Sequence, residues 1–240
     1  MKYMGSKSRI AKYIVPIIQD YIDKNSITTY IEPFVGGANV IDKIRCDVKI
    51  GGDSNKYLIA FWKEIQNGWN PLTDVKMNKN YYESVKQNPD AYNDKYVALC
   101  GLFATYNAVW FGSYAGIVKT KTGIYRDYYN EAVRNVLKQA DNVKDVEFLH
   151  CDYKNIYCKN SVIYCDPPYA GTAKYKDDID HDEYWEWVRK MSKNNIVLCS
   201  EYNAPSDFEC IWQKETFITL RHNTRRKAIE KLFIYNGKNT

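Results

Sequence analysis

The sequence predicts an α/β fold built on a doubly wound, largely parallel sheet that ends in an antiparallel hairpin. A short apolar strand runs into Gly36-Gly37 and is followed by a helical segment, a second strand and Asp53. Apolar runs at 161–165 and 195–200 flank a helical stretch near 182–192, and two more strand-like runs close the chain. Strands that alternate with helices are typical of parallel sheets, whereas two consecutive strands favour an antiparallel pair.

The first unit of this sheet is predicted from residues 8–67. Apolar residues at helical spacing indicate an amphipathic helix, which Pro16 would kink or break. The predicted elements here are a helix over 8–23, a strand over 29–33, a helix over 38–45, a strand over 47–52 and a helix over 54–67.

Residues 69–141 are predicted to form a small lobe inserted into a catalytic domain made of 1–68 and 142–240. Aromatic and β-branched residues interrupted by glycine over 110–126 indicate a projecting β-hairpin. The other elements predicted from here on are helices near 90–106 and over 127–141, and strands over 146–150, 208–218 and 229–235.

Composition narrows the class of protein. With 240 residues, 26% charged and 45% hydrophobic, the chain suits one globular α/β domain with a small additional lobe. No apolar run is long enough to span a bilayer and the first residues do not open a signal peptide, so we expect a cytoplasmic protein without a membrane partner. The net charge of +5 fits a polyanionic partner without establishing one. Seven scattered cysteines and three histidines give no metal-binding pattern, so we expect no metal.

The turn after the first strand predicts a nucleoside cofactor. Glycines at Gly36 and Gly37 would let the backbone pass close to a ligand, and a carboxylate such as Asp53 at the end of the next strand suits ribose hydroxyls. The alternative is that the glycines only make a tight turn and Asp53 caps the following helix. Neither the dinucleotide spacing Gly-x-Gly-x-x-Gly nor the P-loop is present, which favours a cofactor without a polyphosphate, such as S-adenosylmethionine.

The second candidate site is Asp166-Pro167-Pro168-Tyr169, which follows an apolar strand. Open α/β sheets bind ligands at this edge, and the two prolines fix the direction of nearby carbonyl groups. The Asp166 carboxylate and the Pro167 carbonyl can accept the two hydrogens of an amino group, while Tyr169 offers a flat face to a planar ring. The pattern therefore predicts chemistry on an amino group attached to a planar ring.

This string resembles motif IV of the amino-methyltransferases, and its leading aspartate favours adenine over cytosine. The order of the other motifs resembles the Dam-like, α-class adenine-specific DNA methyltransferases, particularly phage-borne members. The resembling segments are Tyr3-Met4-Gly5-Ser6-Lys7 (motif X), Glu32-Pro33-Phe34-Val35-Gly36-Gly37 (motif I), 53–59 (motif II), Cys151-Asp152-Tyr153 (motif III), 200–203 and 229–236. Ala38 departs from the family, since many members have a second spaced glycine there.

The resemblance implies a Rossmann-like, S-adenosylmethionine-dependent methyltransferase fold with a target-recognition lobe. It implies methyl transfer to the N6 atom of an adenine flipped out of double-stranded DNA. The implied catalytic residues are Asp166, Pro167, Pro168 and Tyr169. The implied cofactor contacts are Tyr3, Lys7, Pro33, Phe34, Gly36, Gly37, Asp53, Asp152, Tyr153 and Asp166.

Two basic regions are candidates for DNA contact, although charged runs are as often simply solvated. The candidates are Trp110, Tyr114, Lys119, Lys121 and Arg126 in the predicted hairpin, and Arg221, Arg225 and Arg226 between the last strands. Two alternatives stay open, namely an amino-methyltransferase acting on RNA or a protein amide, and a catalytically silent DNA-binding relative. The target sequence, a partner endonuclease and the oligomeric state, for which we expect a monomer or weak dimer, are not predicted by any motif.

Overall fold

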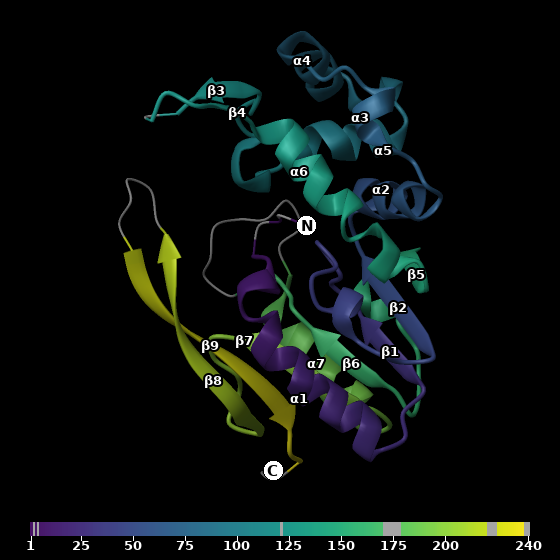
Figure 1. Ribbon diagram of the computed structural model, residues 1–240. Helices are drawn as coiled ribbons and strands as arrows, with labels where there is room; N and C mark the ends of the chain where they lie inside the picture. The colour runs from purple at the N-terminus through teal and green to yellow at the C-terminus, as the bar shows by residue number, and fades with distance from the viewer. Residues whose placement is uncertain (2, 4, 121, 170–178, 220–224, 238–240) are drawn as a thin grey trace.

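The computed structural model describes residues 1, 3, 5–120, 122–169, 179–219 and 225–237, and its centre is a twisted seven-stranded sheet (Figure 1). The strand order is β5-β2-β1-β6-β7-β9-β8. All neighbouring pairs from β5 to β7 are parallel, and β9 is antiparallel to both β7 and β8. The strands are β1 (Thr29–Glu32), β2 (Val48–Asp53), β5 (Val146–His150), β6 (Val162–Cys165), β7 (Ile196–Glu201), β8 (Phe208–Thr219) and β9 (Arg225–Tyr235).

This order confirms the predicted doubly wound sheet with its antiparallel C-terminal hairpin. Strand β1 pairs with β2 on one side and with β6 on the other. The chain therefore builds outward from β1 in one direction and later returns to build in the other. A reversal of this kind separates the loops that follow the two central strands, and ligands bind in the resulting crevice.

Strand residues alternate between two layers of core, because successive side chains of a strand point to opposite faces. Tyr30, Tyr164 and Leu198 face the layer of α1 (Ala11–Lys24) and α2 (Lys56–Gln66). Ile31 and Ile163 face the layer of α7 (His181–Met191). Burial on both faces explains why these strands read as continuous apolar runs.

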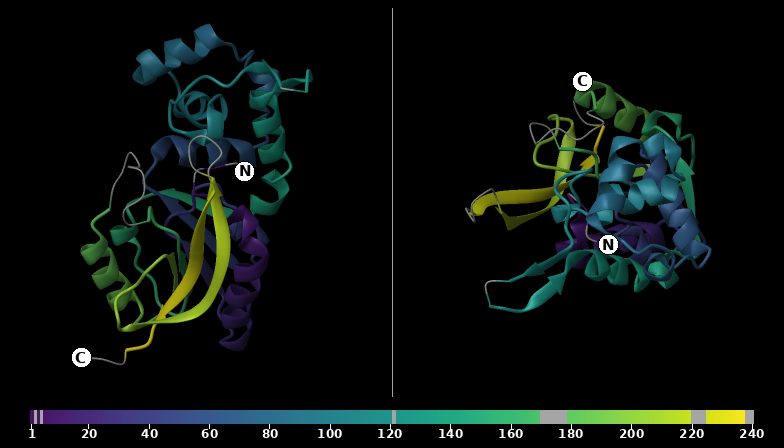
Figure 2. Two further views of the ribbon diagram at one scale, coloured as in Figure 1. Left: turned by 90° about the vertical axis from the view of Figure 1, so that its left-hand side faces the viewer. Right: turned by 90° about the horizontal axis from the view of Figure 1, so that it is seen from above.

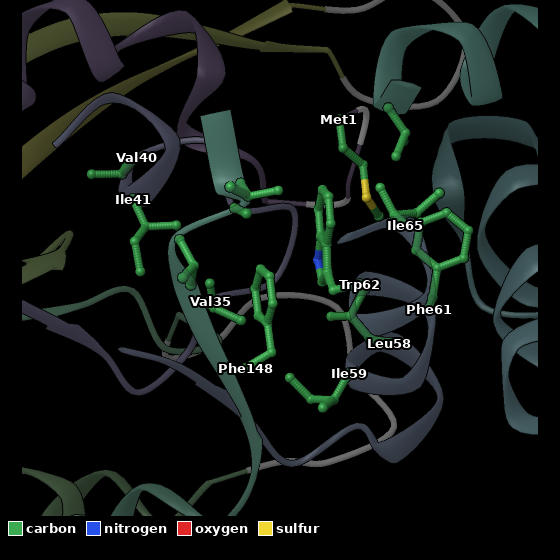
Figure 3. Close-up of a cluster of buried hydrophobic side chains, with 14 of the residues drawn as sticks. Met1, Val35, Val40, Ile41, Leu58, Ile59, Phe61, Trp62, Ile65 and Phe148 are labelled. Carbon is green, nitrogen blue, oxygen red and sulfur yellow. The ribbon is translucent and has the colours of Figure 1, made fainter. Parts of the chain in front are cut away.

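Helix α2 closes the first layer over the glycine turn. Trp62 stacks on Phe148 of β5 with ring centroids 5.5 Å apart, and Leu58, Phe61 and Ile65 surround this pair (Figure 3). The indole Nε1 of Trp62 also donates a hydrogen bond of 3.0 Å to the carbonyl of Gly36. Packing of α2 and the conformation of the turn are therefore linked.

Two predictions for the first unit need correction. Helix α1 runs through Pro16 without a break, with Ile14 and Ile18 fully buried on either side. The helix predicted over 38–45 is wrong, since Ala38 has a left-handed φ of 51° and only the 3-10 turn Ile41–Lys43 is helical. Side chains from distant segments bind the loop's carbonyls, which a helix would need for its own hydrogen bonds.

The 69–141 segment packs at one end of the sheet (Figures 1 and 2). It meets the carboxyl edge, since Trp110 stacks on Tyr57 in the first turn of α2 at 5.4 Å. Its elements are α3 (Pro71–Asp74), α4 (Lys79–Gln87), α5 (Asp94–Ala98), the π-helix Leu99–Phe103, β3 (Ile117–Lys119), β4 (Tyr125–Asp127) and α6 (Tyr128–Leu137). Helix α4 was not predicted; its sequence is mostly polar, and only Tyr82 and Val85 of it are buried.

The β3–β4 pair confirms a hairpin, but it is shorter than the predicted 110–126. Residues 110–116 form turns, because Trp110 and Tyr114 pack inward. A Cβ on Gly101 would lie 2.7 Å from the Trp110 ring, and Tyr114 lies 5.4 Å from the ring of Tyr82. None of the described helices combines the length and apolarity needed to cross a membrane.

Candidate active site

The residue that follows β6, Asp166, forms an ion pair with Lys7 from the amino-terminal segment. Lys7 Nζ lies 2.7 Å from Asp166 Oδ1 and 3.9 Å from Glu230 Oε2 on β9. The three side chains are only 8%, 19% and 15% exposed, respectively. One ammonium group is thus shared between two largely buried carboxylates at the carboxyl edge of the sheet.

Tyr169 completes this group. Its hydroxyl donates a hydrogen bond of 2.9 Å to Glu230 Oε2, and Lys7 Nζ lies 4.3 Å from its ring centroid. The ring also meets Tyr202 edge to face at 4.6 Å. Lys7, Asp166, Tyr169 and Glu230 are called the lysine–carboxylate cluster below.

Burial controls the protonation of Asp166. Removal from water raises its pKa to about 6, Lys7 opposes the rise, and the negative charge of Glu230 adds to it. The ion pair with Lys7 therefore keeps a buried carboxyl group ionised under neutral conditions. An ionised carboxylate only accepts hydrogen bonds, as binding both hydrogens of an amino group requires.

The glycine turn and the end of β2 are joined by Asp53. Its Oδ2 accepts a hydrogen bond of 3.0 Å from the Gly36 amide, and its Oδ1 accepts one of 2.9 Å from the Asn55 amide. Asp53 therefore both holds the turn and caps the start of the next segment. The alternative that Asp53 caps the helix is wrong, because Asn55 is the N-cap of α2 and accepts from the Tyr57 and Leu58 amides. The contact of Asp53 with Gly36 brings the first two predicted cofactor motifs together.

Tyr3 packs on the same turn and explains both glycines. A Cβ on Gly36 would lie 2.9 Å from Tyr3 Cε1, and one on Gly37 would lie 2.9 Å from Tyr3 Cβ. Gly36 also has a left-handed φ of 46°, which favours glycine. Motif X and motif I are thus in direct contact.

The third predicted motif lies beside the first through aromatic contacts. The ring of Phe34 lies 5.2 Å from that of buried Tyr153. Pro33 approaches β2, since a Cβ on Gly52 would lie 3.7 Å from its Cα. Asp152 is exposed, and its carboxylate accepts a hydrogen bond from the Lys154 amide at 2.9 Å, which caps the turn.

Two residues of the site were not singled out from the sequence. Gln139 is buried, and its Nε2 donates to the carbonyls of Gly37 at 3.2 Å and Ala38 at 2.7 Å. No local pattern marks it. Glu230 could have been found, because strand alternation places it on the same face as fully buried Leu232.

The predicted DNA contacts are dispersed. Lys119 is exposed on β3 opposite Tyr125. Arg126 donates two hydrogen bonds to the Glu131 carboxylate, from Nε at 2.6 Å and from Nη2 at 2.5 Å. Lys121 and Arg221 lie outside the described residues, and Arg225 and Arg226 begin β9, where only the backbone is described.

Residues 3–221 match the model of the D12 class N6 adenine-specific DNA methyltransferase family. The chain belongs to this family. The match confirms the resemblance stated from the motifs, and the family's named activity agrees with the predicted enzyme class. Over the described residues, no group of three or more histidine, cysteine, aspartate or glutamate side chains is placed to hold a metal ion.

Individual relatives are more distant. The chain is 24% identical to the type II methyltransferase M.FokI of Planomicrobium okeanokoites over 284 residues, covering 100% of this chain but 43% of that protein. It is 25% identical to the type II methyltransferase M.MjaIII of Methanocaldococcus jannaschii, covering 85% of this chain and 84% of the relative. A solved protein of Pyrococcus horikoshii, provisionally named an RNA methyltransferase, is 8% identical with a TM-score of 0.45, covering 94% and 82% of the two chains.

Proposed function

We propose that this chain transfers the methyl group of S-adenosylmethionine to the N6 atom of a flipped-out adenine at a specific site in double-stranded DNA. The observation that carries the proposal is the largely buried Asp166 carboxylate, paired with Lys7 directly after β6. A solvated carboxylate would be of little use there, because water would compete for the amino group. The nearby Pro167 carbonyl supplies the second acceptor.

The adenine amino nitrogen is a weak nucleophile, because its lone pair is delocalised into the ring. Acceptance of both its hydrogens, by Asp166 and by the Pro167 carbonyl, favours the pyramidal form whose lone pair can attack. Tyr169 offers its ring face to the base, which offsets part of the few kcal/mol that flipping requires. Holding the reacting atoms in line is then the main catalytic task.

The residues around the glycine turn fit S-adenosylmethionine. Gly36 and Gly37 carry no side chain, and Tyr3 leaves no room for one. Two backbone amides hold the Asp53 carboxylate at the end of β2, and a carboxylate in this position suits ribose hydroxyls. The residues that would hold the cofactor are Tyr3, Lys7, Pro33, Phe34, Gly36, Gly37, Asp53, Asp152, Tyr153 and Asp166. When bound, it supplies an electrophilic methyl group on a sulfonium sulfur.

We propose that 69–141 is the target-recognition lobe of a catalytic domain formed by 1–68 and 142–240. The β3–β4 and β8–β9 hairpins project from the same side of the molecule (Figures 1 and 2). Lys119 and Arg126 would meet phosphate on one arm, and Arg225 and Arg226 on the other. Lys121 and Arg221 are proposed as further phosphate contacts, although they lie outside the described residues. Trp110 and Tyr114 would support the lobe from within as well as border the DNA.

The test incubates the purified chain with labelled cofactor and an adenine-containing duplex, and in parallel with RNA and with protein. Label at N6 of duplex adenine supports the proposal. Label in RNA or protein alone would support the amide or RNA alternative, and DNA binding without transfer would support the silent relative.

Asp166→Ala should abolish transfer while the variant still unfolds cooperatively. The control is Asp20→Ala, which removes an exposed carboxylate paired with Lys24 on α1 and should leave transfer intact. Transfer by the Asp166→Ala variant at the rate of the parent would contradict the proposed role of the carboxylate.

A further inference from the structure

We propose that Glu230 of β9 is a positioning residue for the transfer reaction, which orients Tyr169 through its hydroxyl group and shares Lys7 with Asp166. The inference rests on the proposed function. Glu230 lies beyond residues 3–221, the part of the chain that the family model matches. Glu230 lies in the 229–236 segment that resembles the family, but its role is inferred from its contacts in this structure.

Glu230 contacts the hydroxyl group of Tyr169 directly. The tyrosine hydroxyl donates to Glu230 Oε2 at 2.9 Å, and burial, with Asp166 and Glu230 nearby, raises the tyrosine pKa well above its usual value. The hydroxyl therefore keeps its proton and remains a donor. The hydrogen bond fixes the position of the far end of the ring, and the edge-to-face contact with Tyr202 at 4.6 Å orients its flat face.

The charges of the lysine–carboxylate cluster also indicate a functional role for Glu230. Asp166 and Glu230 share the single ammonium group of Lys7, and the 15% exposed Glu230 side chain is held there by β9. Two carboxylates beside one cation are unfavourable when buried, because desolvation outweighs the attraction. An arrangement that weakens the fold is characteristic of functional sites.

Glu230 also affects the pKa of Asp166. The titratable groups around Asp166 come from several elements. They are Lys7 of the 3-10 helix Lys7–Arg9, Glu230 of β9, Glu32 of β1, Tyr164 and Cys165 of β6, and Tyr169. Of the two that act most directly, Lys7 lowers the Asp166 pKa and Glu230 raises it. Loss of the Glu230 charge should therefore make Asp166 easier to ionise.

The experiment compares Glu230→Ala, Glu230→Gln, Tyr169→Phe and the double variant Tyr169→Phe/Glu230→Ala with the parent in steady-state methylation of a duplex. Glu230→Ala should lower kcat by at least about tenfold with KM for DNA nearly unchanged, because a misplaced group affects the transition state more than binding. Glu230→Gln keeps an acceptor for the Tyr169 hydroxyl and should recover most of the rate. In this variant, the decline of the methylation rate at acid pH should nevertheless occur at a lower pH than in the parent. The loss of a merely structural contact would not cause this shift.

The matched control is Glu215→Ala, because Glu215 is an exposed carboxylate on the same hairpin, 3.4 Å from Lys227 Nζ. It should leave kcat and the pH profile unchanged. Tyr169→Phe and Glu230→Ala should be non-additive, with the double variant no slower than Glu230→Ala alone. Additive losses in kcat, a Glu230→Gln variant whose rate declines at the same acid pH as the parent's, or a Glu230→Ala variant with the parent's kcat would each overturn the inference.

The parent, Glu230→Ala, Tyr169→Phe and the double variant are also compared by urea unfolding, which needs no activity. Non-additive losses of stability show the Tyr169–Glu230 coupling even if the parent chain methylates nothing. In that event the proposed function alone fails. Additive unfolding effects would instead remove the contact on which the inference depends, whatever the parent's activity.

Discussion

Lys7 and Asp166 form an ion pair of 2.7 Å that joins the amino-terminal segment to the carboxyl end of β6. The pair lies beside Glu230 and beneath the ring of Tyr169. Chemistry at Asp166 therefore depends on residues from three distant parts of the chain, and each can be tested separately.

The first prediction concerns the pH dependence of transfer. Burial raises the pKa of Asp166 to about 6, and the proposed mechanism needs the ionised form. The value of kcat/KM should therefore fall as pH decreases through about 6 and level off above it, since this parameter reports the free enzyme. Initial rates between pH 5 and 9 at constant ionic strength measure it. A profile that is flat through pH 6 would contradict an ionised Asp166 as acceptor.

The second prediction is that Asp166→Asn inactivates the enzyme yet raises its stability at neutral pH. The pKa of this carboxyl group is raised from its usual 3.8 to about 6 in the folded protein. Protonation of Asp166 therefore stabilises the fold fully below pH 3.8, and this stabilisation is lost as pH rises through about 6. Asparagine is neutral throughout. We expect a gain of up to about 3 kcal/mol at pH 8, because the shift is about two pKa units and one unit corresponds to about 1.4 kcal/mol. Urea unfolding at pH 8 and pH 5 checks this, and the gain should shrink at the lower pH.

The third prediction separates backbone strain from crowding at the glycine turn. Gly36 and Gly68 both have positive φ, 46° and 84°, but a Cβ would meet Tyr3 at Gly36 and nothing within 4 Å at Gly68. Gly68→Ala should cost roughly 1 kcal/mol, as a left-handed alanine does. Gly36→Ala should cost more and should also weaken cofactor binding in calorimetry. Equal effects of the two substitutions on stability and on binding would show that Tyr3 gives way freely.

The fourth prediction concerns Gln139, which ties the segment after α6 to the cofactor turn. Gln139→Ala leaves the carbonyls of Gly37 and Ala38 without this donor, which should cost about 1–3 kcal/mol and lower cofactor affinity. Gln66→Ala is the matched control, since its Nε2 donates to the carbonyls of Val143 and Val146, both at 2.7 Å. The control should lose stability and keep its affinity. A parallel loss of affinity in both variants would make the effect on the turn indirect.

The fifth prediction tests the β3–β4 hairpin as a DNA contact. Lys119→Ala should weaken binding to all duplexes and make the salt dependence shallower by about 0.9, the value for one phosphate contact. Arg126 can reach phosphate only by leaving Glu131, so Glu131→Gln should tighten binding. Fluorescence anisotropy at several salt concentrations measures both. A salt slope unchanged by Lys119→Ala would place that lysine outside the interface.

Much of the fold could be predicted because its strands are buried on both faces. Val162–Cys165 and the first four residues of Ile196–Glu201 are short apolar runs, which favour strands buried on both faces. The helix predicted over 38–45 is wrong because side chains from distant segments set the conformation there. The carbonyls of this turn accept hydrogen bonds from Trp62 and Gln139, and no local sequence pattern predicts these contacts.

By itself, the sequence determined the class of fold and the order of the motifs, and it predicted amino-group chemistry at Asp166-Pro167-Pro168-Tyr169. These follow from residue types and spacings within short segments, where backbone preference and burial act locally. Only the tertiary structure decided that Asp166 and Glu230 share Lys7, that Tyr3 lies on Gly36, and that Gln139 binds the glycine turn. Such contacts depend on strand order and on how distant segments pack, and the free energy that selects them belongs to the whole folded chain.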